Sequence, residues 1–177
     1  EYDRRLAEKD AAPAMAWFAG YAELVVAEFH RRRTATEPAQ AAYDRSLARF
    51  ARYREATGSD DGQHYVAMAH GGKARLCLQA DDLAGAFAQL ELAFAAKAPA
   101  AIAAVDGLGI TTMQTAEMLR GKLLDKKDQA MLDRLEAALK ALPREAFELP
   151  EYEKASRGQS ASGANNPGTG QIGRAHV

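Results

Sequence analysis

The sequence predicts an all-α fold made of about three helical hairpins, and three observations support that prediction. The 177 residues are 47% hydrophobic but only 7% aromatic, and the commonest residue is alanine, which is the strongest helix former. Apolar residues recur every three or four positions, as they do in helices with one buried face. Finally, the segments AAYDRSLARF (41–50), GAFAQLELAF (85–94) and AMLDRLEAAL (130–139) repeat one pattern at intervals of about 45 residues.

Each of these three segments is expected to be the second helix of a hairpin. Their apolar residues are spaced i, i+3 or i+4, i+7, which places them on one face of an amphipathic helix. The segments follow turn-like stretches, TATEPAQ, QADDL and LDKKDQ, whose Thr, Pro and Asp residues favour the first turn of a helix. The expected apolar faces are Tyr43/Leu47/Phe50, Phe87/Leu90/Phe94 and Leu132/Leu135/Leu139.

The first helix of each hairpin is expected within residues 14–33, 62–80 and 112–124. Thr111 is followed three residues later by Gln114, which is a capping-box pattern for the start of the third of these helices. Each hairpin has an apolar face that it cannot bury alone, so successive hairpins are expected to stack. The apolar residues assigned to these helices include Trp17, Tyr21, Leu24, Val25, Ala27, Phe29, Tyr65, Met68, Ala69, Leu76, Cys77, Met113, Ala116, Met118, Leu119 and Leu123, and the small residues expected to let helices approach are Gly20, Gly71, Gly72 and Ala74.

These segments resemble the repeats of the tetratricopeptide (TPR) family. AWFAGYAEL (16–24) is similar to the family's first helix, and AQAAYDRSLARF (39–50) is similar to its second helix. DLAGAFAQLELAFAAKAP (82–99) and MLDRLEAALKALP (131–143) each end in proline, as the family's second helices do. The resemblance covers roughly residues 1–143, with RRLAEKDAAPAMAW as the tail of an earlier second helix, and it implies an α-α superhelix, or solenoid.

The resemblance departs from the family in its spacing, because the interval exceeds the usual 34 residues. The extra length falls in REATGSDDGQ and KAPAAIAAVDGLGI. Beyond the helical region 1–143, residues 144–170 are expected to be a flexible linker or tail, since they include the Gly-, Ser- and Asn-rich stretch SRGQSASGANNPGTG. Residues 171–177, QIGRAHV, are expected to be non-native read-through of a sequencing adapter, and the chain to be a fragment.

The charge, the cysteine content and the hydropathy argue against nucleic-acid binding, an internal disulfide and a membrane span. A net charge of −1 and a pI near 6.5 give no basic footprint for nucleic acid. The one basic run, HRRRTATEP, is explained by the favourable effect of cations at a helix C-terminus. Cys77 is the single cysteine and cannot form an internal disulfide. No apolar run approaches the roughly 20 residues that cross a bilayer.

The residues that could perform chemistry do not form a recognisable site. His70 and Cys77 share a helix face but lie about 10 Å apart along the axis at about 1.5 Å per residue, too far for one zinc ion. The stretch IAAVDGLGITTMQTAEML has Thr112 where a dinucleotide fingerprint needs its third glycine. We therefore expect no catalytic site, no metal and no cofactor.

The expected function is that of a protein-interaction module. Stacked hairpins form a concave surface lined by their first helices, and such a surface holds a peptide or partner protein. Alternative predictions are the helical scaffold of a larger enzyme, regulator or envelope lipoprotein, and a closed bundle around an apolar ligand. The candidate partner-binding residues, chosen as exposed polar positions on the first helices, are Glu23, Gln63, His70, Lys73, Arg75 and Gln114; the cationic ones favour an acidic peptide.

Overall fold

The computed structural model describes residues 12–96 and 111–143, and these residues form six α-helices and no strand. The all-α prediction is therefore confirmed for this part of the chain. The predictions made for residues 1–11, for the 144–170 tail and for residues 171–177 fall outside the described residues. The helices are α2 (Pro13–Arg32), α3 (Thr36–Thr57), α4 (Gln63–Gln79), α5 (Leu83–Ala96), α6 (Thr112–Lys126) and α7 (Gln129–Lys140).

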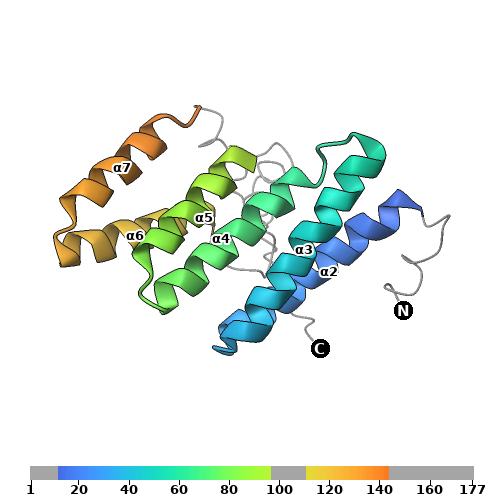
Figure 1. Ribbon diagram of the computed structural model, residues 1–177, viewed down its shortest axis with the longest axis horizontal. Helices are drawn as coiled ribbons and strands as arrows, with labels where there is room; N and C mark the ends of the chain where they lie inside the picture. The colour runs from blue at the N-terminus through green and yellow to red at the C-terminus, as the bar shows by residue number, and fades with distance from the viewer. Residues whose placement is uncertain (1–11, 97–110, 144–177) are drawn as a thin grey trace, which may run out of the picture.

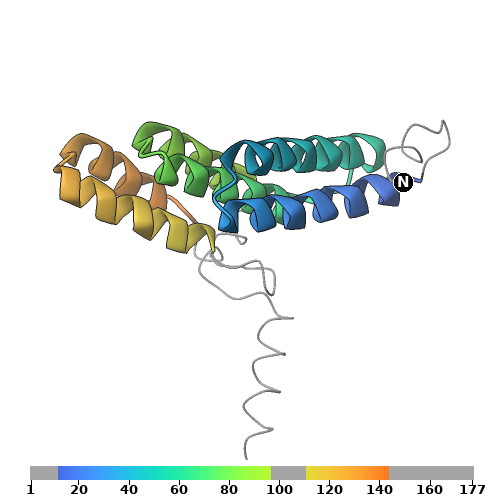
Figure 2. The ribbon, with the colours of Figure 1, turned by 90° about the horizontal axis from the view of Figure 1, so that it is seen from below.

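Consecutive helices pack as three hairpins, α2 with α3, α4 with α5 and α6 with α7. Figure 1 shows the hairpins following one another across the molecule, from α2 and α3 at one end to α6 and α7 at the other. In Figure 2, α2 and α6 lie below α3 and α7. Each hairpin also touches the next, because α4 packs against both α2 and α3, and α6 packs against both α4 and α5.

The three hairpins turn in the same way. Thr34, Asp81 and Lys127 each adopt a left-handed backbone, with φ of 56°, 60° and 58°. In each turn the next residue donates its N–H to the carbonyl five positions earlier: Ala35 to His30 at 3.0 Å, Asp82 to Cys77 at 2.9 Å, and Asp128 to Leu123 at 3.0 Å. This is the Schellman motif, which usually places glycine at the left-handed position. No glycine marks it here, so the sequence predicted the turns but not their type.

Side-chain caps begin the helices that follow. Asp82 accepts a hydrogen bond from the Gly85 N–H at 2.9 Å, and Asp128 accepts one from the Met131 N–H at 3.1 Å. Thr111 and Gln114 form the predicted capping box, with N–H to side-chain distances of 3.0 and 2.8 Å. These caps satisfy backbone donors that a helix start leaves without partners.

The second helices bury the same positions in the same order. Ala39, Ala42, Tyr43, Ser46 and Phe50 are buried in α3, and the residues 44 positions later, Leu83, Ala86, Phe87, Leu90 and Phe94, are buried in α5. In α7, Leu132 and Leu135 continue the series 45 residues further on. Two positions of the predicted apolar faces, Leu47 and Leu139, are only partly buried. In α3, the neighbour of Leu47, Ser46, takes the core position that Leu90 holds in α5.

Ser46 occupies a core position because its hydroxyl has a partner. It donates a hydrogen bond to the backbone carbonyl of Gly20 in α2 at 2.8 Å. The close approach that permits this contact also requires glycine, since a Cβ at position 20 would lie 3.0 Å from the Phe50 ring. The predicted role of small residues is therefore confirmed at the contact between α2 and α3.

Gly72 allows a close contact between α4 and α3, and a substitution at this position tests that contact. A Cβ at this position in α4 would overlap the buried Tyr43 ring of α3. We expect Gly72→Ala to destabilise the fold by about 1–3 kcal/mol through overpacking, measured by urea denaturation. The matched control is Gly121→Ala on the exposed side of α6, where nothing lies within 4 Å of the added Cβ. The control should instead gain up to about 1 kcal/mol from helix propensity, and equal effects at both positions would contradict the proposed contact.

Candidate functional site

A buried carboxylate lies where the three hairpins meet. Glu28 of α2 is 3% exposed, and it accepts hydrogen bonds from three side chains. Arg31 contacts it at 2.9 Å from the same helix, Arg75 of α4 contacts it at 2.6 Å, and the Tyr43 hydroxyl of α3 donates to it. Arg75 also donates to the Thr115 hydroxyl of α6 at 3.0 Å. One guanidinium and one carboxylate thus connect four helices from all three hairpins.

The electrostatics of this network keep it in one ionisation state. Burial by itself raises the pKa of the Glu28 carboxyl, but the hydrogen bonds of Arg31 and Tyr43 and the charges of Arg75 and Arg31 hold the pKa below its usual value. Burial and the neighbouring Glu28 charge raise the pKa of the Tyr43 hydroxyl. At neutral pH, Glu28 is therefore ionised and Tyr43 is protonated. The cluster fits a structural role, because its side chains form hydrogen bonds and ion pairs with one another.

One candidate binding residue belongs to this network. Arg75 was expected to be exposed, and that expectation is wrong, because its side chain is 5% exposed in the ion pair with Glu28. The sequence suggests exposure because arginine is rarely buried without a partner. The partner here is 47 residues away in the chain, which no local pattern reveals.

Two other candidate residues line a cleft between α3 and α4. Leu47, Ala51 and Val66 supply apolar surface, and Arg54, Glu55, Gln63 and His70 supply polar groups. The cleft has a volume of about 470 Å³. A smaller hollow of about 230 Å³ adjoins it, sharing Arg54 and Gln63 and reaching Ala95 and Ala96 at the end of α5. Gln63 therefore stands where the two hollows meet.

His70 connects the cleft to the next helix. Its Nδ1 lies 2.9 Å from the Gln89 side-chain oxygen of α5. Burial lowers the pKa of His70, and the nearby Lys73 charge lowers it further; together they outweigh the hydrogen bond to Gln89 and the charge of Asp44, which raise it. His70 is therefore neutral at pH 7. Because an amide oxygen only accepts, Nδ1 carries the proton and Nε2 remains an acceptor.

The remaining candidates are held in contacts within the chain. Lys73 pairs with Asp44 of α3 at 2.7 Å, one helical turn beyond His70. Glu23 forms a bidentate pair with Arg45, with both distances 2.9 Å. Gln114 is used in the capping box at the start of α6. The structure thus gathers Gln63, His70 and Lys73 on one side of α4 and places Glu23 and Gln114 elsewhere.

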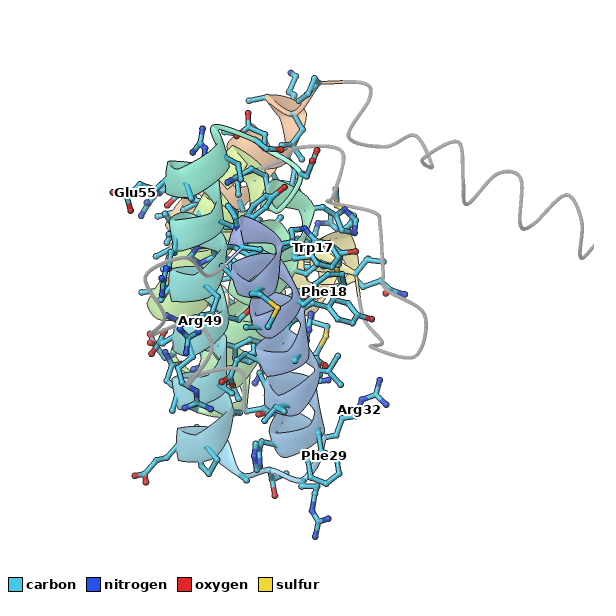
Figure 3. The ribbon with its side chains drawn as sticks, turned by 90° about the vertical axis from the view of Figure 1, so that its right-hand side faces the viewer. Trp17, Phe18, Phe29, Arg32, Arg49 and Glu55 are labelled. Atoms are coloured by element: carbon cyan, nitrogen blue, oxygen red, sulfur yellow. The ribbon has the colours of Figure 1, made fainter. Side chains whose placement is uncertain are left out.

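A second surface was not anticipated from the sequence. Phe18, Val25, Val26 and Phe29 of α2 are 54, 38, 39 and 55% exposed, and we call these four residues the α2 face. Figure 3 shows Phe18 and Phe29 on the side of α2 opposite to Arg49 and Glu55 of α3. The Arg33 guanidinium lies 5.2 Å from the centre of the Phe29 ring. Val25 and Phe29 were expected in the core, so their exposure is a correction.

Neither a metal site nor a membrane span is found within residues 12–96 and 111–143. No three His, Cys, Asp or Glu side chains of these residues come together as a metal ion requires. Of the helices described, none is long and apolar enough to cross a bilayer. Comparison of the chain with family models, curated proteins and solved structures gave no match.

The Glu28 network predicts a large and pH-dependent effect of one isosteric change. Glu28→Gln leaves two buried guanidinium groups without their carboxylate, so we expect a loss of about 3–5 kcal/mol in unfolding free energy. Because the pKa of folded Glu28 lies below its ordinary value of 4.5, its contribution is complete above about pH 4.5 and is lost as pH falls through the folded pKa. The variant's stability should therefore depend less on pH between about 2 and 5.

The measurement is urea denaturation of both proteins over that pH range. Glu117→Gln is the control, because Glu117 is exposed and lies 4.0 Å from Arg120. It should leave the midpoint unchanged at neutral pH. A Glu28→Gln protein as stable as the wild type at pH 7 would contradict the buried ion pair.

Proposed function

We propose that the chain is a module of stacked helical hairpins that binds a peptide or partner protein without catalysing a reaction. The arrangement we propose is a TPR-like α-α superhelix. It is supported by three hairpins with the same turn, by second helices that bury matching positions 44 and 45 residues apart, and by contacts of α4 with α2 and of α6 with α4. A stacked array in which each unit contacts its neighbours has this pattern of contacts.

The observation that carries the binding proposal is the cleft between α3 and α4. Its apolar surface, from Leu47, Ala51 and Val66, suits one side chain of a bound segment. Polar groups surround that surface, as in sites that bind a side chain and orient the backbone around it. The volume of about 470 Å³ lies within the range of about 300–1,000 Å³ typical of ligand pockets.

The polar groups of the cleft match the needs of a peptide backbone. The Gln63 amide supplies a donor and an acceptor, so it pairs with both groups of one peptide unit. His70 is neutral and presents Nε2 as an acceptor for a peptide N–H. We place the peptide here and not along the first helices because Gln63, Val66 and His70 all line the space beside α3. Specificity then rests mainly on shape and hydrogen bonds, and less on the acidic character expected from the cationic candidates.

Val66 offers the direct test, because it lies on the apolar surface of the cleft and is partly exposed. A displayed library of random 12-residue peptides would be selected on the full chain, and the enriched peptides titrated by fluorescence anisotropy. We expect Val66→Glu to weaken their binding at least tenfold, which is about 1.4 kcal/mol, because a carboxylate then occupies the apolar surface.

Leu124→Glu is the matched control. Leu124 is a half-exposed apolar residue of α6, away from the cleft, so this change should leave the affinity unaltered. Circular dichroism would establish that both variants fold. Peptides that bind Val66→Glu as tightly as the wild type, or a selection that enriches no peptide, would overturn the proposal.

A further inference from the structure

The cationic residues that favoured an acidic peptide are engaged elsewhere. Arg75 is buried in its ion pair with Glu28, and Lys73 is paired with Asp44 at 2.7 Å. Neither Arg75 nor Lys73 lines the cleft between α3 and α4. The charge of a bound segment therefore has to be inferred from the side chains that do line the cleft.

Glu55 is the only carboxylate among the residues that line this cleft. It is exposed two residues before the end of α3, and Figure 3 shows it extending outward from that helix. No ion pair found among residues 12–96 and 111–143 includes it. The C-terminal end of a helix carries partial negative charge, which favours a cation and opposes an anion. A bound cation beside Glu55 would therefore be stabilised both by the carboxylate and by the end of α3.

The cation that lines the cleft, Arg54, already has a compensating partner. Its guanidinium lies 2.9 Å from the Asp60 carboxylate, and both side chains line the adjoining hollow. His70 is neutral at pH 7 because its pKa is lowered. Since Asp60 offsets Arg54, the charge of Glu55 leaves the two hollows with one net negative charge.

The cleft orders its apolar and acidic groups along α3. Leu47, Ala51 and Glu55 are each four residues apart, so they lie on one side of the helix. Four helical residues rise about 6 Å at about 1.5 Å per residue. In an extended peptide, residues i and i+2 point the same way and lie about 6.6 Å apart, at about 3.3 Å per residue. A side chain that packs on Ala51 and Val66 thus places the residue two positions away beside Glu55.

We propose that the cleft selects an extended segment that carries an apolar residue and, two positions away, an arginine or lysine. The apolar side chain enters the hollow formed by Leu47, Ala51 and Val66, and the basic side chain pairs with Glu55. This inference rests on the proposed function, and it assigns a basic segment where the sequence favoured an acidic one. Because an exposed ion pair contributes little by itself, Glu55 sets the preference between segments and the apolar contact supplies most of the affinity.

The peptides selected on the full chain give the first readout. They should carry arginine or lysine two positions from an apolar residue more often than the starting library does. One such peptide is compared with derivatives in which glutamine or glutamate replaces the basic residue. Affinity for the wild-type chain, measured by fluorescence anisotropy, should fall in that order by about three- to fivefold per step, the effect of one exposed ion pair. The differences should shrink in about 0.5 M salt, because exposed charges are screened.

Glu55→Lys tests the residue itself. It should reverse the order of the three peptides, so that the glutamate derivative binds at least about three times as tightly as the basic peptide. The change places a cation near a helix C-terminus, so the variant should be at least as stable as the wild type. Glu91→Lys is the matched control, since Glu91 is exposed on α5 and lines neither hollow. It should keep the wild-type order.

Val66→Gln separates this inference from the proposed function, because it makes the apolar surface polar without adding a charge. The selected peptides should lose at least about fourfold in affinity, as for the loss of one buried methylene. Peptides that respond to Val66→Gln but bind Glu55→Lys in the wild-type order, or a selection that enriches acidic peptides at this cleft, would overturn the charge assignment alone. Peptides that respond to Glu55→Lys but not to Val66→Gln, or a selection that enriches none, would overturn both proposals.

Discussion

The arrangement of the hairpins depends on the burial of one carboxylate. Glu28 loses its hydration on folding, and an ionised group without compensation would be far too costly to bury. Arg31, Tyr43 and Arg75 compensate for that loss, and they come from three different helices. Arg75 also donates a hydrogen bond to Thr115 of α6. The Glu28 carboxylate therefore keeps its hydrogen bonds only if the three hairpins hold their positions relative to one another.

Because the core is rich in alanine, the Glu28 network is needed to select one register of the helices. Small side chains pack closely in many registers, whereas the network is satisfied in one register of α2, α3, α4 and α6. We regard this as a hypothesis of specificity, in which polar contacts select the arrangement and apolar contacts supply most of the stability. Gly72 acts with the network, because it admits the Tyr43 ring whose hydroxyl reaches Glu28.

The cleft follows from this arrangement. Close contact of α4 with Tyr43 holds the middle of α4 against α3, while Leu47, Ala51 and Val66 leave a hollow further along. Its polar groups are positioned by neighbours, His70 by Gln89 and Arg54 by Asp60. A site on helices supported in this way is held more precisely than one on loops.

The sequence predicted the parts of the fold that depend on local signals. Helical periodicity located the helices, Thr111 and Gln114 marked a cap, and the glycines indicated close packing. It failed where a residue's environment is decided by distant partners. Ser46 is buried because the Gly20 carbonyl is near, and Arg75 is buried because Glu28 is near.

Of the candidate site, the sequence named Gln63 and His70 but not the cleft that they line. Periodicity shows which residues share a helix face, but not whether that face is covered. For this reason Val66 was missed, and Phe29 was assigned to the core although it is exposed. The left-handed residues Thr34, Asp81 and Lys127 were also unpredictable, since no glycine marks them.

The most direct test of the central claim is a double-mutant cycle between Glu28 and Thr115. Both side chains bind Arg75, so Glu28→Gln and Thr115→Val should interact through it. Unfolding free energies of the two single variants and the double variant, measured in urea, should depart from additivity by at least about 1 kcal/mol. Effects that add to within about 0.3 kcal/mol would show that the two positions are independent, and would contradict a network that joins the three hairpins.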